Sequence, residues 1–357
     1  MSIRAAQVTD LGSIDEIYAL GKDLSLQGEG ATHPIRLWQM ITRTFSSLLP
    51  LATPSEMLFV LEDDKGKVVG FIQAEMLAPA GRTRASEAMR VLNLSLAPSL
   101  AGAAGGALID HLSNEAIAKG VGRIYVRIPE GHPVMESFKA HAFRRYAQDR
   151  VFFRETLGEP SKIEPISGLR AARRKDLFGL FTLYLASTPK PVSQVEAPDY
   201  DQWRAVHEAE WLQRFGRRPS KSMVVEHANE IVGWVGIEPA QPGRPHTLSI
   251  MARGDFSPRG DLQEQLLAHA QRELAGQPGA IWCNVRNYDT TTTRVLQDGG
   301  FENLAGQELL VRELRARALA PARKPKKEKV MAPVFGALVR MRPLSSRQPS
   351  HGPRIVS

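Results

Sequence analysis

The chain of 357 residues contains one cysteine, Cys283. A single cysteine cannot form an intramolecular disulfide or a cysteine-based metal cluster, which fits a reducing compartment. No run of apolar residues approaches the length that is needed to cross a bilayer. The opening MSIRAAQVTD lacks the basic region and apolar stretch of a secretory signal. We therefore expect a cytoplasmic protein that does not bind a membrane.

Acidic residues are scarce at the C-terminal end. Residues 315–357 carry eleven Lys and Arg but one acid, Glu328, so this tail has a net charge of +10 and residues 1–314 have −2. The basicity therefore belongs to the tail. Because the tail is also rich in proline, we expect it to be largely disordered. The run Arg323–Lys329 has no interleaved aromatic residue, so binding of nucleic acid by the tail is an alternative that the pattern does not favour.

What the chain does contain is a repeat. Ile3–Leu20 returns as Leu169–Ala186, with identical residues that include Arg4/Arg170 and Asp10/Asp176 at an offset of 166. Later landmarks follow in the same order at slightly smaller offsets: Val68–Glu75 with Ile231–Glu238, Ala107–Leu112 with Gln265–Ala270, and Ala142–Phe143 with Gly300–Phe301. The offset only shrinks, as a slightly shorter second copy requires. The repeat is domain-sized, so it predicts two similar globular units rather than a solenoid.

Hydrophobic periodicity gives both copies the order β-α-α-β-β-β-α-β-α-β. We place the first domain at residues 1–155 and the second at 168–314. Residues 156–167 contain proline and glycine without periodicity and form the predicted linker, and the basic tail follows at 315–357. The expected fold class is α/β (α+β), in which each domain has a mixed, mainly antiparallel sheet flanked by helices.

A junction of small residues is the first candidate site. After the predicted strand Arg90–Ala97, the residues Leu100–Gly106 lead into a helix. Unpaired N–H groups and the dipole at a helix start bind anions, and small residues let a phosphate approach the backbone. An ordinary glycine-rich turn is the competing interpretation.

The order of elements and these motif positions resemble the GNAT acyltransferase superfamily, here in tandem, over roughly residues 1–155 and 168–314. The resemblance implies acetyl-CoA or another acyl-CoA as the cofactor, with its pyrophosphate at the junction and its thioester beside the preceding strand. The predicted cofactor-binding residues are Leu96, Ala101, Gly102, Ala103, Ala104, Gly105 and Gly106.

Both copies depart from the family's motifs. The family's loop reads Arg/Gln-x-x-Gly-x-Gly/Ala, but Leu100 stands at the leading position of the first copy. In the second copy Asp261 would repel phosphate, and an ordinary capped helix start is the competing interpretation. The family's Tyr-x-x-x-Gly-Phe motif has Phe138 and Leu296 at the tyrosine positions, and neither side chain can donate a proton.

The catalytic residues therefore stay unknown. The two strands that match the family's catalytic strand offer only Asn93, Ser95, His246 and Ser249 as polar candidates. A histidine can act as a base near neutral pH, although a lone histidine beside a proline-rich turn is more often a surface residue.

The substrate residues are predicted in the second copy, before its hairpin. Tyr200, Trp203 and His207 occupy the segment that matches the family's substrate wall, and Trp203 and His207 share one helix face. Core packing is the competing interpretation of this aromatic stripe. His207 and Glu208 do not face each other and no third ligand is suitably spaced, so no metal site is expected.

Two classes of function remain. The leading hypothesis is an acyl-CoA-dependent N-acetyltransferase that acts on a small amine. The alternative is a non-catalytic tandem GNAT-like binding or scaffold protein, with a tail that contacts nucleic acid. The acceptor, the active copy and the oligomeric state stay open.

Overall fold

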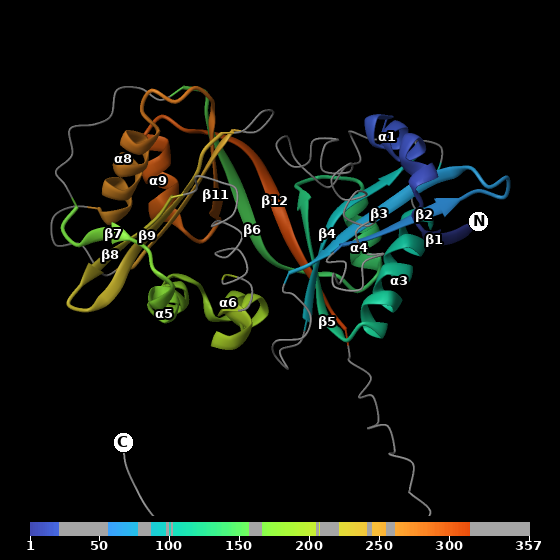
Figure 1. The fold of residues 1–357 in the computed structure, drawn as a ribbon, viewed down its shortest axis with the longest axis horizontal. Helices are drawn as coiled ribbons and strands as arrows, with labels where there is room; N and C mark the ends of the chain where they lie inside the picture. The colour runs from blue at the N-terminus through green and yellow to red at the C-terminus, as the bar shows by residue number, and fades with distance from the viewer. Residues whose placement is uncertain are drawn as a thin grey trace, which may run out of the picture. The chain divides into compact units, whose positions relative to one another are not determined.

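All the described strands belong to one sheet in the computed structural model. The structure describes residues 1–20, 56–77, 87–97, 100, 103–156, 166–204, 207, 221–240, 245–254 and 261–314. The strand order is β1-β2-β3-β4-β5-β12-β6-β11-β10-β9-β8-β7 (Figure 1). The described residues all belong to one compact unit, Met1–Arg317. The tail from residue 315 and the linker residues 157–165 lie outside the described residues.

The two repeats supply equivalent elements in the same order. The first contributes β1 (Ser2–Ala5), η1 (Val8–Asp10), α1 (Leu11–Leu20), β2 (Glu56–Glu62), β3 (Val68–Met76), β4 (Glu87–Leu96), α3 (Ala103–Ala118), β5 (Val121–Pro129), α4 (Val134–Ala140) and β6 (Arg144–Arg154). The second contributes β7 (Leu169–Ala171), η4 (Arg174–Asp176), α5 (Leu177–Ser187), α6 (Lys190–Glu196), β8 (Lys221–His227), β9 (Glu230–Glu238), β10 (His246–Ala252), α8 (Leu262–Leu274), β11 (Ile281–Arg286), α9 (Thr290–Asp298) and β12 (Glu302–Glu313).

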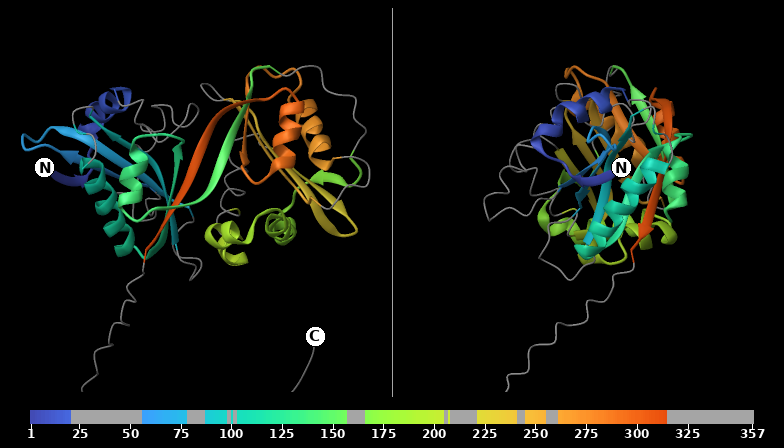
Figure 2. Two further views of the ribbon diagram at one scale, coloured as in Figure 1. Left: turned by 180° about the vertical axis from the view of Figure 1, so that it is seen from behind. Right: turned by 90° about the vertical axis from the view of Figure 1, so that its right-hand side faces the viewer.

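The repeats exchange their last strands. β12 of the second repeat lies between β5 and β6 of the first and is antiparallel to both. β6 of the first repeat in turn pairs with β11 of the second. Figures 1 and 2 show β6 and β12 as two long neighbouring strands that link the halves. Each half of the sheet is therefore completed by a strand of the other repeat. The sequence predicted a separate sheet for each repeat and did not indicate this exchange.

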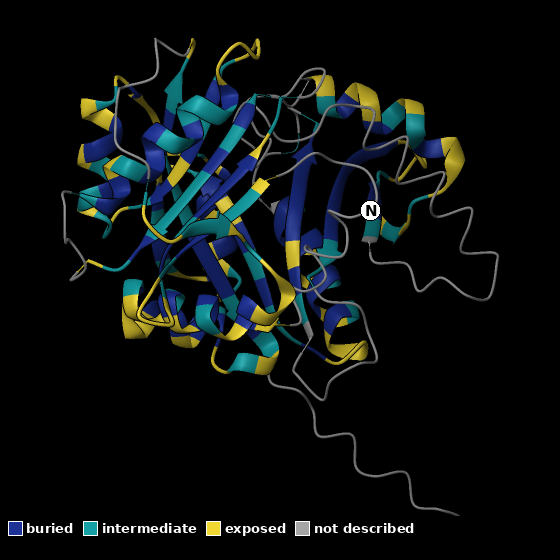
Figure 3. Ribbon diagram, turned by 60° about the vertical axis from the view of Figure 1, so that its left-hand side comes forward, coloured by how far each residue is buried: buried dark blue, intermediate teal, exposed yellow. Residues whose placement is uncertain are grey.

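Side chains alternate between the two faces of the sheet, and different helices cover each face. On one side, Ile72 and Leu94 pack against Leu108 of α3 and Phe138 of α4, and we call this side the α3 face. The helices α8 and α9 cover the same face of the second half. On the other side, Phe71 packs against Ile14 of α1, and we call it the α1 face. The central strands are mostly buried (Figure 3).

The hydrophobic cores follow the strand exchange. Leu310 of β12, from the second repeat, is fully buried in the core of the first half. Phe152 of β6, from the first repeat, is fully buried in the core of the second half. Neither core is therefore built from one repeat alone. The mixed, mainly antiparallel sheet with flanking helices confirms the expected fold class, and no described helix has the length and apolar character of a membrane span.

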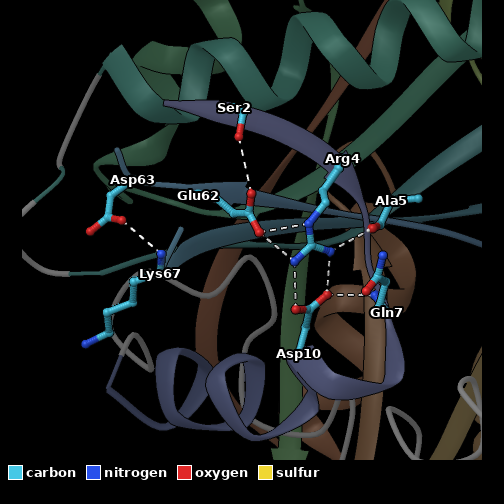
Figure 4. Close-up of polar contacts among 8 residues, drawn as sticks. All are labelled: Ser2, Arg4, Ala5, Gln7, Asp10, Glu62, Asp63 and Lys67. Atoms are coloured by element: carbon cyan, nitrogen blue, oxygen red, sulfur yellow. Dashed lines mark hydrogen bonds and ion pairs between the residues drawn. The ribbon is translucent and has the colours of Figure 1, made fainter. Parts of the chain in front are cut away.

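The residues that are identical in the two repeats form the same ion pairs twice. In the first repeat, Arg4 of β1 donates to Asp10 at 2.7 and 2.9 Å and to Glu62 at 2.8 Å. Asp10 also accepts from the backbone N–H of Gln7 at 2.7 Å, so it fixes the start of the helical segment (Figure 4). The second repeat has the same network with Arg170, Asp176 and Glu226. The matching letters of the sequence thus mark a matching structural element.

These pairs predict a dependence of stability on pH. Hydrogen bonds from Arg4 and Arg170 lower the pKa of Asp10 and of Asp176 in the folded protein. The unfolded chain therefore binds more protons, and the stabilisation is complete above the ordinary aspartate pKa of about 4 and is lost as the pH falls through the lower folded value. We expect Asp176→Asn to cost about 1–2 kcal/mol at pH 7 and to flatten the loss of stability below pH 5.

Urea unfolding at a series of pH values between 7 and 3 measures this effect. Asp64→Asn is the control, because the Asp64 side chain is 90% exposed. An acid dependence that is unchanged in the Asp176→Asn protein would contradict the assignment.

Candidate functional site

The strands β4 and β5 of the first repeat run parallel and then diverge. Their pairing begins at Glu87 with Val121 and ends at Arg90 with Tyr125. Beyond that point β4 continues to Leu96 along β3, while β5 continues along β12. Within the described part of the chain, no other strand pairs with the edge of β4 that β5 leaves. We call this place the β4–β5 divergence.

A bulge distorts β4 at the same place. Val91 pairs with Ala74 and Asn93 with Gln73, so Leu92 is an extra residue on β4. A bulge changes the direction of the strand and re-aims the groups that follow it. The divergence and the bulge together set the backbone of β4 apart from the regular sheet before the chain enters α3.

The predicted cofactor residues surround the start of α3. Leu96 is the buried last residue of β4, and α3 begins at Ala103. No acidic residue lies in the first turn of α3. The structure therefore brings Leu96 and Ala103–Gly106 together at one strand-to-helix junction, while Ala101 and Gly102 lie outside the described residues.

The two glycines of the first turn allow close packing inside the first half. A Cβ on Gly105 would lie 3.4 Å from a methyl carbon of Leu96 and 3.9 Å from the hydroxyl of Ser137. A Cβ on Gly106 would overlap the ring of His141, with Nε2 at 2.7 Å. The Cβ positions of the two glycines thus face β4 and the end of α4, where no space is left for a side chain on Gly106.

His141 ties α4 to α3 beside this turn. Its Nδ1 lies 2.7 Å from the carbonyl oxygen of Ser137, and its Nε2 lies 3.4 Å from Oδ2 of Asp110. Arg312 of β12 donates to Asp110 at 3.3 Å and to Ser113 at 2.9 Å. The helix α3, whose first turn forms the candidate site, is therefore held by the end of α4 and by β12 of the other repeat.

The polar residues of β4 are buried on the α1 face. Asn93 and Ser95 are fully buried, and Gln73 of β3 is 2% exposed. Asn93 donates from Nδ2 to Oε1 of Gln73 at 2.7 Å. In the described structure, Oδ1 of Asn93 and the hydroxyl of Ser95 have no hydrogen-bond partner. Unpartnered buried polar atoms are costly and usually mark strain or a place for a water or ligand.

The second repeat has the same divergence but a different helix start. β10 and β11 pair from His246 with Ile281 to Leu248 with Cys283 and then separate. Asp261 caps α8, because its carboxylate accepts from the N–H of Gln263 at 3.1 Å. Asp261 also pairs with Arg294 at 2.7 Å. The helix start is thus occupied by the chain's own carboxylate, which is the capped start that the sequence offered as an alternative.

His246 is not a surface residue, so that interpretation of the sequence is wrong. It is 1% exposed. Its Nδ1 accepts from the N–H of Ala240 at 2.8 Å, and its Nε2 lies 3.2 Å from the carbonyl of Pro278. Both ring nitrogens therefore serve to join two loops. Nearby, burial raises the pKa of the Cys283 thiol to about 12, which keeps it neutral and a poor nucleophile.

The predicted substrate residues lie together in a hydrophobic cluster. Trp203 is 6% exposed, and it packs with Phe181 of α5 at a ring distance of 5.6 Å. The Tyr200 ring lies 5.5 Å from the same phenylalanine, and the His207 ring lies 4.2 Å from Trp203. Trp203 thus has the core packing that the sequence offered as the competing interpretation, while Tyr200 and His207 are partly exposed and their role in substrate binding stays a prediction.

The positions of the family's tyrosine are also in the cores. Phe138 is fully buried and packs edge-on against Phe143 at 4.9 Å. Leu296 is fully buried in the second half. Neither can supply a proton. Among the described residues no group of three or more His, Cys, Asp or Glu could hold a metal ion.

A group of charged residues that the sequence did not indicate lies at the centre of the α1 face. Asp149 of β6 is 3% exposed, and it lies 3.1 Å from Arg127 of β5 and 3.1 Å from Arg286 of β11. Arg286 also pairs with Glu196 of α6. We call Arg127, Asp149, Glu196 and Arg286 the central charge cluster. Its members come from four elements, so no local spacing could have revealed it.

The second repeat also covers β5 on this face. Tyr125 of β5 donates its hydroxyl to the carbonyl of Val195 at 2.6 Å, and Arg123 donates to Gln202 at 3.4 Å. Val192 of α6 packs against Leu309 of β12. The segment that contains α6 therefore lies against β5 next to the β4–β5 divergence. Because burial raises the pKa of Tyr125 and its hydroxyl is engaged, it is not a ready proton donor.

Comparisons with known proteins locate the fold. No known protein family and no curated protein matches the sequence. Among solved structures, a GCN5-related N-acetyltransferase from Sphaerobacter thermophilus matches with a TM-score of 0.55 and 14% identity over 87% of this chain and 95% of that one. A tandem GNAT protein from the clavulanic acid biosynthesis pathway matches with a TM-score of 0.56 and 13% identity over 87% and 98%.

A third structure shares the fold within a larger protein. The glucosamine N-acetyltransferase region of a fungal multi-domain β-N-acetylglucosaminidase matches with a TM-score of 0.58 and 12% identity, over 87% of this chain and 38% of that one. At these identities the likeness concerns the fold. The chain thus has the tandem GNAT fold that the repeat and its motifs predicted.

Proposed function

We propose that the chain is an acyl-CoA-dependent N-acyltransferase and that its first repeat holds the cofactor. The observation that supports this most is the β4–β5 divergence followed directly by a helix with a small-residue, acid-free first turn. The divergence leaves a strand edge that can bond to an extended amide-containing arm, and the helix start favours a diphosphate. The second repeat has the divergence, but its helix start is capped by Asp261.

The residues present fit an acyl-CoA in the first repeat. Ala103, Ala104, Gly105 and Gly106 carry little or no side chain, so backbone N–H groups would hold the diphosphate at the start of α3. The edge of β4 from Val91 to Leu96 would orient the arm. When bound, acetyl-CoA supplies the acyl group as a thioester. The chain's own part is to align an amine with that thioester and to keep the surroundings dry.

One helix-start variant tests the cofactor site. Gly102 directly precedes α3, as Asp261 directly precedes α8. We expect Gly102→Asp to weaken acetyl-CoA binding by about tenfold or more, because a carboxylate would compete for the N–H groups and repel the diphosphate. The same change should leave the folded state as stable or slightly more stable, since Asp is a good helix cap.

Isothermal titration with acetyl-CoA and thermal unfolding measure the two effects. Asp261→Gly is the matched control, and it should leave acetyl-CoA affinity unchanged while it lowers stability. If folded wild-type protein releases no heat with millimolar acetyl-CoA, the cofactor site is wrong. If Asp261→Gly, rather than Gly102→Asp, changes the affinity, the site belongs to the second repeat.

A non-catalytic binding protein is the second candidate. The burial of Phe138 and Leu296 at both tyrosine positions favours it, because the usual proton donor is absent twice. Transfer to an amine is still feasible without that donor, since water can carry the proton. Release of free thiol from acetyl-CoA over many cycles with an amine would exclude the second candidate, and binding without any turnover would favour it.

A further inference from the structure

We infer that the acceptor of the proposed reaction carries an anionic group beside its amine, and that Arg90 and Arg127 bind the anion while Asn93 orients the amine. This inference rests on the proposed function and names its substrate class. It is carried by two arginines and the unpartnered amide oxygen of Asn93, which share one face of the sheet at the β4–β5 divergence.

The strand register places these residues. Arg90 is the last β4 residue paired with β5, opposite Tyr125. Arg127 lies two residues further along β5, so alternation puts it on the same face. Arg90 pairs with Glu75 and Asn93 with Gln73 on β3, which places both on the α1 face as well. Asn93 and Arg127 therefore lie on opposite strands of the divergence, with Arg90 where the strands part.

The two arginines keep donors for a ligand. Their side chains are 51% and 44% exposed. Arg90 forms an ion pair with Glu75 on β3, to which it donates from Nε at 2.9 Å and also from Nη2, so its Nη1 group has no part in that pair. Arg127 contacts Asp149 at 3.1 Å through Nη2 alone, and Asp149 also contacts Arg286. A guanidinium has five N–H donors and binds carboxylate or phosphate in a two-pronged manner.

Asn93 supplies the complementary group for the amine. Its Nδ2 is held by Gln73, which leaves the acceptor Oδ1 fully buried without a partner in the described structure. An amine N–H can donate to this oxygen. The hydroxyl of Ser95, two residues further along the same strand face, is also unpartnered. A substrate with one positive or neutral N–H end and one anionic end matches this set.

The reaction then balances without another reactant. The amine nitrogen attacks the carbonyl carbon of the thioester, a C–N bond forms and the C–S bond breaks. The nitrogen loses one proton, and the departing sulfur gains one, so the products are an amide and a free thiol. The hydrogen bond to Oδ1 of Asn93 would fix the direction of the nitrogen lone pair.

Matched acceptor pairs test the inference on the full-length protein. One arm compares amino carboxylates of several lengths with their carboxamides, such as β-alanine with β-alaninamide, and the other compares 2-aminoethyl phosphate with ethanolamine. Free-thiol release should favour the anionic member of at least one pair by roughly 10- to 100-fold in kcat/KM. The arm with the larger preference identifies carboxylate or phosphate as the anion.

Variants separate the two roles. Arg127→Met should raise KM for the anionic member about tenfold or more and leave the neutral member unchanged, while Arg127→Lys keeps part of the preference. Asn93→Ala should lower kcat for both members about equally. Arg253→Met is the control, because Arg253 is similarly exposed at 39% and pairs with Glu230 in the second repeat. Thermal unfolding verifies that each variant is folded.

The outcomes distinguish the inference from the proposed function. If acetyl-CoA does not bind, both fail. If acetyl-CoA binds and neutral amines react as well as anionic ones, or if Arg127→Met leaves the ratio unchanged, the inference alone fails. If acetyl-CoA binds and no amine reacts, the proposed enzyme fails, and equal binding of both members of every pair by calorimetry overturns the anion site too.

Discussion

Residues 1–155, produced without the second repeat, will fail to form a stable monomer. The fragment lacks β12, so β5 loses the partner that it pairs with from Arg123 to Pro129. It also lacks Leu310, which is fully buried in the first core. Removal of a buried leucine side chain alone costs roughly 2–5 kcal/mol, and here a whole strand is removed with it. An exposed strand edge also promotes self-association.

Cleavage of the linker is the matched control. A protease site inserted at Pro160, within the predicted linker, cuts the chain but removes no strand. We expect the two pieces to stay associated and to unfold together, because β6 and β12 still cross between the halves. Light scattering with size exclusion, together with thermal unfolding, compares the fragment, the cut protein and the intact chain. A monomeric fragment 1–155 with a cooperative transition at the intact protein's temperature would refute the interdependence.

The repeat can be recognised in the sequence because its identical residues form the same ion pairs in both copies. Arg4 and Arg170 lie on the first strand of each repeat, and each binds an aspartate six residues later. Such local pairs leave a spacing that can be recognised in the sequence. The same holds for the order of strands and helices, which depends on hydrophobic periodicity within each element.

No comparable pattern in the sequence indicates the exchange of β6 and β12. In the sequence, the patterns of Arg144–Glu155 and Gln307–Glu313 each predict the last strand of a repeat. Periodicity indicates which residues face the core, but it does not say which neighbouring strand completes the ladder. β6 and β12 are equivalent in the two repeats, so exchange and non-exchange would bury similar side chains. The choice depends on packing between repeats, which one sequence does not reveal.

The candidate site divides in the same way. The junction from Leu96 to Gly106 can be predicted because it is contiguous in the chain, and its cofactor role stays a prediction. The central charge cluster cannot be predicted in this way, because Arg127, Asp149, Glu196 and Arg286 meet only when β5, β6, α6 and β11 come together. Arg123, Tyr125 and Arg127 alternate with apolar residues along β5, which indicates a polar face of that strand but not the residues that it meets.

Arg286→Met will be the most destabilising single substitution in the central charge cluster. The substitution removes the arginine that pairs with two carboxylates: Asp149, which is 3% exposed, and Glu196, which is 18% exposed. Asp149 would keep only the half-exposed Arg127, and Glu196 would keep the hydroxyl of Tyr184 at 2.9 Å. Leaving buried charges without a partner costs about 3–5 kcal/mol, and urea unfolding at pH 7 measures it.

A triple variant distinguishes two causes of this destabilisation: unpaired buried carboxylates and the loss of ion-pair attraction. If the unpaired carboxylates are the cause, then Arg286→Met combined with Asp149→Asn and Glu196→Gln should recover most of the lost stability, although more contacts have been removed. Arg144→Met is the control, since Arg144 and Glu313 are 55% and 57% exposed, and we expect a change within about 0.5 kcal/mol. A triple variant less stable than Arg286→Met would show instead that the cluster's attraction outweighs the cost of burying its charges.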